Sequence, residues 1–272
     1  MYPVVRGRPA RNTAGVRVLF VADVVGPRAV RWLCERLPAL RAEHDADLAI
    51  VDAENCGADA GSMSVAGVEE LLAAGADVVT GGNHAFDGSE VEAVLALERV
   101  LRPLNVADTV PGRGWLTLSA GGEDVRVVVL ADCLALADAP SFAHMALEPY
   151  AAWAALAPGP TTIVEMHALS VMAKQGLAYA LDGQVAAVLG THTHEPTLEL
   201  RLLPRGTALV TDVGMTGPRD GPQGIHPQVL IDHVRGVAAA ARSPIRPADG
   251  EIVLGAVVLE IEDGRTTSLI RL

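Results

Sequence analysis

The alternation of short apolar runs with segments of helical spacing constrains this chain more than any other feature. The run VRVLFVAD (16–23) has the length and continuous apolar character of a buried strand, and residues 28–43 then place Val30, Leu33 and Leu37 on one helical face. The alternation continues with a strand over 47–55, a helix over 65–75 and a strand over 76–84. Strands that alternate with helices form parallel sheets covered by those helices, so we predict an α/β fold.

The second half of the chain consists mainly of strand-like segments. A short helix is expected over 90–97, a hairpin over 115–132 with its turn in GGED, and single strands over 161–167, 184–194 and 207–214. The last part, 251–272, supplies two strands joined across EDGR, which we expect to lie in a second sheet. Residues 16–272 are therefore predicted to form a single domain. Residues 1–15, which lack the apolar core of a secretory signal, are predicted to form a flexible N-terminal extension.

Composition sets limits on the core and on the partners. Hydrophobic residues make up 50% of the 272 positions and aromatic residues only 3%, so Val, Ala and Leu must fill most of the core. The net charge of −12 disfavours a groove for long nucleic acid, but it is compatible with a small anionic substrate if bound metal reverses the local charge. Three cysteines without metal-finger spacing favour a reduced, cytoplasmic protein. No apolar run reaches the ~18 residues of a membrane span.

Polar side chains of a restricted chemical kind stand at the ends of five separate strand segments. They are acidic, amide or imidazole groups: Asp23, Glu54 and Asn55, Asn83 and His84, His167, and His192 with His194. Open α/β sheets place their ligand sites outside the carboxyl ends of the strands. Carboxylate and imidazole ligands together suit zinc, iron or manganese, so the pattern predicts a metal site at this edge.

Several of these residues also have an ordinary structural interpretation. Asp23 is a good cap for the helix that follows, and GNH (82–84) can be a glycine-rich turn with a surface histidine. His167 alone is compatible with a hydrogen-bonded core histidine. The pair His192 and His194 favours a ligand role more strongly, because residues i and i+2 of an extended segment face the same side. The metal interpretation explains all five strand ends together, whereas the ordinary ones need a separate coincidence at each.

In chain order, the blocks DVVG, EN, GNH, H and GTHTH resemble the ligand blocks of the calcineurin-like metallophosphoesterases. More narrowly, ADVVG, AEN, TGGNHAFD, LDGQVAAVLGTHTH and VTDVGMTGP are similar to a small bacterial family of 2′,3′-cyclic-nucleotide 2′-phosphodiesterases, from about Val16 to the C-terminus. Glu54 belongs to the narrower match, because most members of the superfamily carry Asp there. The resemblance implies a metallophosphoesterase-type sandwich of two mixed β-sheets flanked by helices, with the site at the C-terminal strand ends.

The resemblance also implies a dinuclear metal site in which Glu54 bridges the two ions. The other implied ligands form two sets: Asp23, Asn55 and His194 for one metal, and Asn83, His167 and His192 for the other. Two divalent or trivalent ions are implied, with iron as the first candidate and manganese or zinc as alternatives. His192 and His194 would then bind different metals, although only one residue separates them.

The implied reaction is hydrolysis of a small cyclic nucleotide, either 2′,3′-cyclic or 3′,5′-cyclic, by a hydroxide that the two metals share. His84 would be the proton donor to the leaving oxygen rather than a ligand, since an imidazole titrates near the working pH. Two alternatives stay open: a broad-specificity metal-dependent phosphomonoesterase, and a metal-binding regulatory protein with little catalysis. A homo-oligomer is compatible with the amphipathic stretch QGIHPQVLIDHVRGV (223–237), which a plain surface helix explains equally well.

One stretch departs from the family pattern. Where the family has a polar run after the His167 position, this chain reads HALSVMAK (167–174), in which Leu169, Val171, Met172 and Ala173 replace polar groups and only Lys174 is kept. No implied metal ligand is changed. Residues around metal ligands tune metal affinity, so the departure leaves open how active the protein is and which substrate it takes.

Overall fold

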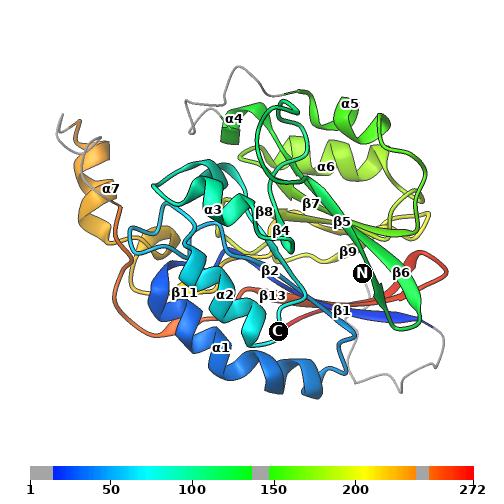
Figure 1. The fold of residues 1–272 in the computed structure, drawn as a ribbon, viewed down its shortest axis with the longest axis horizontal. Helices are drawn as coiled ribbons and strands as arrows, with labels where there is room; N and C mark the ends of the chain where they lie inside the picture. Colours follow the sequence, from blue (N-terminus) through cyan, green and yellow to red (C-terminus); the bar gives the residue numbers. More distant parts are fainter. Residues whose placement is uncertain (1–14, 137–146, 237–244) are drawn as a thin grey trace.

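The computed structural model describes residues 15–136, 147–236 and 245–272. Two six-stranded mixed sheets lie face to face, and helices cover the outer face of each (Figure 1). The predicted sandwich of two mixed sheets flanked by helices is therefore confirmed. The predicted N-terminal extension lies outside the described residues, apart from Gly15.

The first sheet contains the strands from both ends of the described chain. Its spatial order is β14 (Arg265–Arg271), β13 (Ala256–Glu262), β1 (Val16–Val21), β2 (Leu48–Asp52), β3 (Val78–Thr80) and β4 (Val100–Leu101). The run from β1 to β4 is parallel, while β13 pairs antiparallel with β1 and β14 antiparallel with β13. The terminal hairpin thus extends the first sheet.

The second sheet is built from the middle of the chain. Its spatial order is β5 (Trp115–Ala120), β6 (Glu123–Ala131), β7 (Thr161–His167), β8 (Ala187–Thr191), β10 (Ala208–Val210) and β9 (Arg201–Leu202). β6, β7, β8 and β10 are parallel neighbours, and antiparallel strands close both edges. A separate two-stranded ribbon joins β11 (Gly217–Pro218) to β12 (Ile252–Val253).

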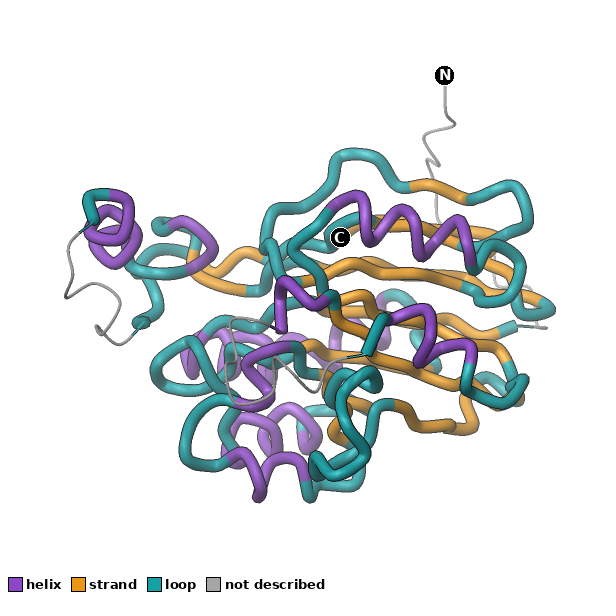
Figure 2. Tube along the Cα trace, turned by 90° about the horizontal axis from the view of Figure 1, so that it is seen from above, coloured by secondary structure: helices purple, strands orange, loops and turns teal. Residues whose placement is uncertain are grey.

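Helices on the two outer faces complete the layers. The first sheet is covered by α1 (Gly26–Glu43), α2 (Val65–Ala73) and α3 (Val91–Leu95), and the second by α5 (Pro149–Ala154) and α6 (Val171–Ala180), whereas α4 (Cys133–Leu136) directly follows β6 (Figure 1). Figure 2 shows the same layering from above. In both views α7 (Pro227–Val234) stands apart from the two sheets, and none of its residues is buried.

The parallel strands are buried on both faces, which explains why their sequences are continuous apolar runs. In β1, Leu19 and Val21 contact the cluster under α1, which includes Leu33. The alternate residues Val18 and Phe20 join the cluster between the two sheets. Successive strand residues point to opposite faces, so a strand buried on both sides needs apolar residues at every position.

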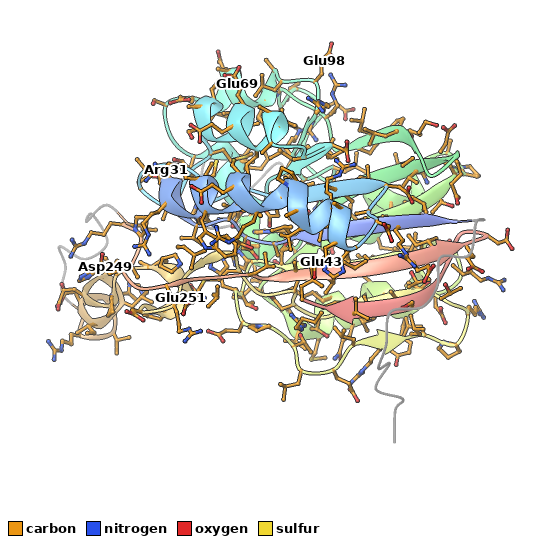
Figure 3. All side chains as sticks on the ribbon, turned by 90° about the horizontal axis from the view of Figure 1, so that it is seen from below. Arg31, Glu43, Glu69, Glu98, Asp249 and Glu251 are labelled. Atoms are coloured by element: carbon orange, nitrogen blue, oxygen red, sulfur yellow. The ribbon has the colours of Figure 1, made fainter. Side chains whose placement is uncertain are left out.

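Charged side chains lie mainly on the outside. Figure 3 shows Glu69 and Glu98 pointing away from the body on the side of the helices that cover the first sheet. Among the described residues, no helix is both long enough and apolar enough to cross a membrane.

Three expectations about strands need correction. The C-terminal hairpin, predicted for a second sheet, lies in the first one, because β13 pairs with β1 and buries Val257, Leu259 and Ile261 between the sheets. The third strand, predicted to end at Asn83 and His84, ends at Thr80, and both residues lie in the short 3₁₀ helix η1 (Asn83–Phe86). The strand predicted over 184–194 ends at Thr191, and His192 and His194 have positive φ angles, so they are not alternate residues of an extended segment.

Leu33→Ala should lower the free energy of unfolding by about 2–5 kcal/mol, because it leaves a cavity between α1 and the first sheet. Leu33 is fully buried in the outer cluster. Urea unfolding monitored by circular dichroism measures the loss. Leu198→Ala, at a fully exposed position, is the matched control and should change stability by less than about 0.5 kcal/mol. Equal effects of the two substitutions would contradict this account of the core.

Candidate metal centre

The predicted site residues meet at one edge of the sandwich, beyond the carboxyl ends of the parallel strands. Asp23 follows β1, and Glu54 and Asn55 follow β2. Asn83 follows β3, His167 is the last residue of β7, and His192 and His194 follow β8. Asp23, Glu54, Asn55, Asn83, His167 and His194 are buried, whereas His192 and His84 are partly exposed. The structure therefore brings together residues that are spread over 172 positions of the chain, from 23 to 194.

One group of potential ligands forms around His167. Its Nε2 lies 2.8 Å from Oδ1 of Asn83, 3.2 Å from Oε2 of Glu54 and 3.0 Å from Nδ1 of His192. The ligand atoms of Glu54, His167 and His192 all lie within 4.8 Å of one another. Such convergence of nitrogen and oxygen atoms suits one metal ion.

A second group forms around His194. Its Nε2 lies 3.5 Å from Oδ1 of Asp23 and 3.3 Å from Nδ2 of Asn55. Asn55 in turn donates from Nδ2 to Oε1 of Glu54, at 3.0 Å. The ligand atoms of Asp23, Glu54 and His194 lie within 4.8 Å of one another, so Glu54 belongs to both groups.

The backbone is held in an unusual conformation at three of these residues. Asp23, His192 and His194 have positive φ angles of 41°, 88° and 63°. Positive φ costs energy for residues other than glycine, and it persists only where the surrounding structure enforces it. Part of that enforcement is visible, because the backbone amide of His192 donates to Oδ2 of Asp23 at 3.2 Å.

Glycine is required at position 82 by the close approach of the site. A Cβ atom placed there would collide with the ring of His167 and with Oε2 of Glu54. Without it, the amide of Gly82 donates to Oε2 of Glu54 at 3.1 Å, and the amide of His84 to the same oxygen at 3.4 Å. The GGNH stretch thus fixes one oxygen of Glu54 and places Asn83 beside it.

A polar layer separates the ligand candidates from the apolar core between the sheets. Asp52, Thr80, Glu165 and Thr191 alternate with residues of the outer faces, so their side chains point between the sheets like the neighbouring Ile50 and Ile163. Thr191 links His167 to Glu165, because its Oγ1 lies 3.0 Å from Nδ1 of His167 and donates to Oε1 of Glu165, at 3.0 Å. This link holds the His167 ring with Nε2 toward the first ligand group.

Burial raises the pKa of the carboxyl groups at this edge. The pKa values of Asp23 and Asp52 lie well above the usual range for Asp, first because both are buried and then because other carboxylates lie close by. Burial also raises the pKa of Glu54, and it raises that of Glu165 to about 7. Without cations the cluster therefore retains protons at pH values where exposed carboxyl groups have lost them.

The histidines shift in the opposite direction. Burial, aided by the neighbouring positive groups, lowers the pKa of His192 and of His194 to about 4, and it holds that of His167 well below its usual value. These imidazoles are neutral at physiological pH, which is the form that binds metals.

His84 lies next to the ligand candidates and has a carboxylate of its own. Its Nδ1 is 2.9 Å from Oδ2 of Asp87, and its side chain is 22% exposed. Asp87 therefore orients the imidazole of His84 at the solvent-facing side of the site.

The comparisons with known proteins agree with the geometry. The chain matches the family described as "YmdB-like protein" over residues 19–272. It belongs to this family. A curated relative, the "2',3'-cyclic-nucleotide 2'-phosphodiesterase" of Bacillus subtilis (strain 168), is 32% identical over 253 residues, which cover 91% of this chain and 92% of the relative. The resemblance identified in the sequence is thereby confirmed.

Two solved structures share the fold over nearly their whole length. A hypothetical protein from Thermus thermophilus is 35% identical, with a TM-score of 0.82 over 93% of this chain and 97% of the other. A protein from Mycoplasma pneumoniae described as a novel phosphatase is 27% identical, with a TM-score of 0.81 over 95% of this chain and 93% of the other.

Sequence reasoning missed the residues beneath the ligands. Asp52 contributes to a third compact group with Asp23 and His167, all within 4.8 Å, yet it was not selected as a site residue. Glu165 and Thr191 were also not selected. A signal was present, because a charged residue in a continuous apolar strand such as TTIVEMH is rare unless it has a partner.

Glu165→Gln should stabilise the metal-free protein at neutral pH. The pKa of Glu165 is about 7 in the folded chain and near 4.5 when unfolded, so the folded chain holds a proton that the unfolded chain releases between these values. The contribution of Glu165 to the free energy of unfolding of the wild type is therefore fully present below about pH 4.5 and is lost as the pH rises to 7. Glutamine keeps the acceptor for Thr191 and does not titrate.

The stability advantage of Glu165→Gln over the wild type should therefore grow by about 1–3 kcal/mol between pH 4.5 and 7.5, in urea unfolding with chelator present. Glu69→Gln, on the exposed side of α2, is the control and should show no such trend. An advantage that stays constant with pH would contradict the raised pKa of Glu165.

Proposed function

We propose that this chain is a dinuclear-metal phosphodiesterase that hydrolyses small cyclic nucleotides, first of all 2′,3′-cyclic ones. The observation that carries the proposal is the pair of ligand groups that share Glu54, with His167 and His192 on one side and Asp23 and His194 on the other. Residues 16–272 would act as one catalytic unit.

The residues fit a pair of metal ions. In the part of the chain that the structure describes, Oδ1 of Asp23 and Nδ2 of Asn83 are buried and have no hydrogen-bond partner. Buried polar groups normally have hydrogen bonds, so a carboxylate oxygen that lacks one among other carboxylates favours an occupant of positive charge. The imidazole and carboxylate donors suit iron, and equally manganese or zinc. Asp23, Asn55 and His194 would hold one ion, Asn83, His167 and His192 the other, and Glu54 both.

The protein residues supply orientation and proton transfer. When bound, the two ions supply Lewis acidity toward a phosphoryl oxygen and make water a nucleophile at neutral pH. The link from Glu165 through Thr191 fixes the His167 ring, and Gly82 fixes Glu54. His84, oriented by Asp87, is the proposed proton donor to the leaving oxygen.

Family membership supports a phosphoester as the substrate. The relative from B. subtilis bears the name 2',3'-cyclic-nucleotide 2'-phosphodiesterase. The family match over residues 19–272 covers the segments that carry all the proposed ligands. A phosphomonoesterase is the second candidate, because the similar M. pneumoniae structure is described as a phosphatase. The net charge of −12 favours small substrates over long nucleic acid in either case.

The metal-loaded protein should hydrolyse 2′,3′-cyclic AMP at its 2′-ester bond and accumulate 3′-AMP, with little release of phosphate from 3′-AMP itself. Chromatography of the products, with 3′,5′-cyclic AMP in parallel, measures this. Turnover of 3′-AMP in preference to the cyclic substrate would favour the phosphomonoesterase. Two bound metals without turnover would favour a metal-binding regulatory protein. Elemental analysis of protein purified without added metal identifies the ions.

His84→Ala should keep both metals and reduce turnover by about 10²–10⁴-fold, the usual contribution of a positioned proton donor. Asp87→Asn should cause a smaller loss, because it leaves the imidazole in place and only weakens its orientation. Metal content and turnover are measured on the same samples. A His84→Ala protein that loses metal but keeps its rate per bound metal would show that His84 is a ligand.

A further inference from the structure

The chain contains a single lysine among its 21 lysine and arginine residues, and this lysine lies in the interior. Lys174 is on α6, one turn after the capping residue Ser170, and its residue exposure is 0%. Burying an ammonium group is costly unless it is paired and hydrogen-bonded. A buried lysine at this position therefore needs a partner of negative charge.

That partner is Asp212, the second residue after β10. Nζ of Lys174 donates to Oδ2 of Asp212 at 2.8 Å, and the two side chains are 1% and 4% exposed. The pair is shielded from water, so its electrostatic attraction is stronger than that of a surface ion pair. Loss of one partner would leave a buried charge without compensation.

Asp212 also holds the turn that carries two proposed metal ligands. Its Oδ2 accepts from the backbone amide of Thr193 at 3.2 Å and from Oγ1 of Thr193 at 2.6 Å. Thr193 lies between His192 and His194, both of which have positive φ angles. Asp212 thus accepts two hydrogen bonds from the middle residue of a turn whose backbone conformation is intrinsically unfavourable.

Lys174 connects this turn to the segment that carries His167. β7 ends at His167, and the side chain of Ser170 caps α6 by accepting from the amide of Ala173 at 3.2 Å. The stem of Lys174 then passes over Gly190, where a Cβ atom would lie 2.9 Å from its Cδ and would collide with the carbonyl of Thr211. The glycine of GTHTH leaves room for the lysine.

We infer that the buried pair Lys174–Asp212 positions His192 and His194 for metal binding by tying their turn to α6. Both residues are positioning residues, and neither is a proposed ligand. The inference rests on the proposed metal site. It assigns a role to the lysine that is kept in HALSVMAK and to the aspartate of VTDVGMTGP.

Substitutions at Thr193 and Asp212 test the inference. Asp212→Asn removes the charge, and Thr193→Val removes one hydrogen bond to Asp212 and leaves the ion pair intact. Thr193→Ser restores the hydroxyl group. Asp182→Asn is the matched control, because Asp182 is also a buried carboxylate that accepts backbone amides, those of Arg205 and Thr207, but at the opposite end of β8.

Two measurements separate positioning from mere stabilisation. Chelator competition with Mn²⁺ or Fe²⁺ gives the affinity of each metal, and hydrogen exchange of the Thr193 amide reports on the turn in metal-free protein. Asp212→Asn, Lys174→Met and Thr193→Val should each lower the affinity for at least one of the two metal ions by about 10–100-fold. They should also speed hydrogen exchange of the Thr193 amide. Thr193→Ser should bind metal nearly as the wild type does, and Asp182→Asn should lose stability without losing metal affinity.

The opposite results are equally clear. If Asp212→Asn and Thr193→Val bind both metals as tightly as the wild type, the pair only stabilises the fold and the inference is wrong. The Thr193 variants decide the question even if Lys174→Met or Asp212→Asn does not fold, because they keep both charges. A wild-type chain that takes up no metal overturns the proposed function and this inference together, whereas unchanged variants of a metal-binding wild type overturn only the inference.

Discussion

The energetic cost of burying four carboxyl groups close together constrains the rest of this structure. Asp23, Asp52, Glu54 and Glu165 are each at most 1% exposed. Removing a carboxylate from water costs several kcal/mol, and neighbouring like charges add to that cost. The fold can keep such a cluster only if protons or cations neutralise it. The raised pKa values describe the first solution, and the proposed pair of metal ions would be the second.

The sandwich architecture creates the cluster. The apolar side chains between the sheets end with Ile50 and Ile163, and the next inward-facing positions on the same strands are Asp52 and Glu165. Strand pairing within each sheet fixes the positions of Asp52 and Glu165, and the packing of the two sheets brings them together. The loops beyond these strand ends carry the ligand candidates. Strained backbone at Asp23, His192 and His194 adds to the energetic cost. Functional sites are commonly regions where stability is given up in this way.

Much of this arrangement could be predicted from local sequence, because strand ends are local features. The segment TTIVEMH predicted β7 with both bounds correct, and its last residue, His167, lies in the site. The layer beneath could not be predicted in the same way. Asp52 lies inside an apolar run, and only the packing of one sheet on the other shows that Glu165 is near it. Pairing between distant segments also placed β13 beside β1, which no local pattern indicated.

The departure from the family pattern in HALSVMAK falls mainly on the exposed side of α6 and on the turn before it. Leu169, Val171 and Met172 are 53%, 52% and 82% exposed, so these three replacements lie on the surface, whereas Ala173 is partly buried and packs against the cluster under the second sheet. The buried side of the helix keeps Lys174, together with Leu177 and Ala178 in the cluster under the second sheet. A helix separates its two faces by its period of 3.6 residues, so one can change without moving the other. The exposed replacements therefore change the surface of α6 and of the turn before it, and they leave intact the contact of Lys174 with Asp212 and that of Asp212 with the turn that carries His192 and His194.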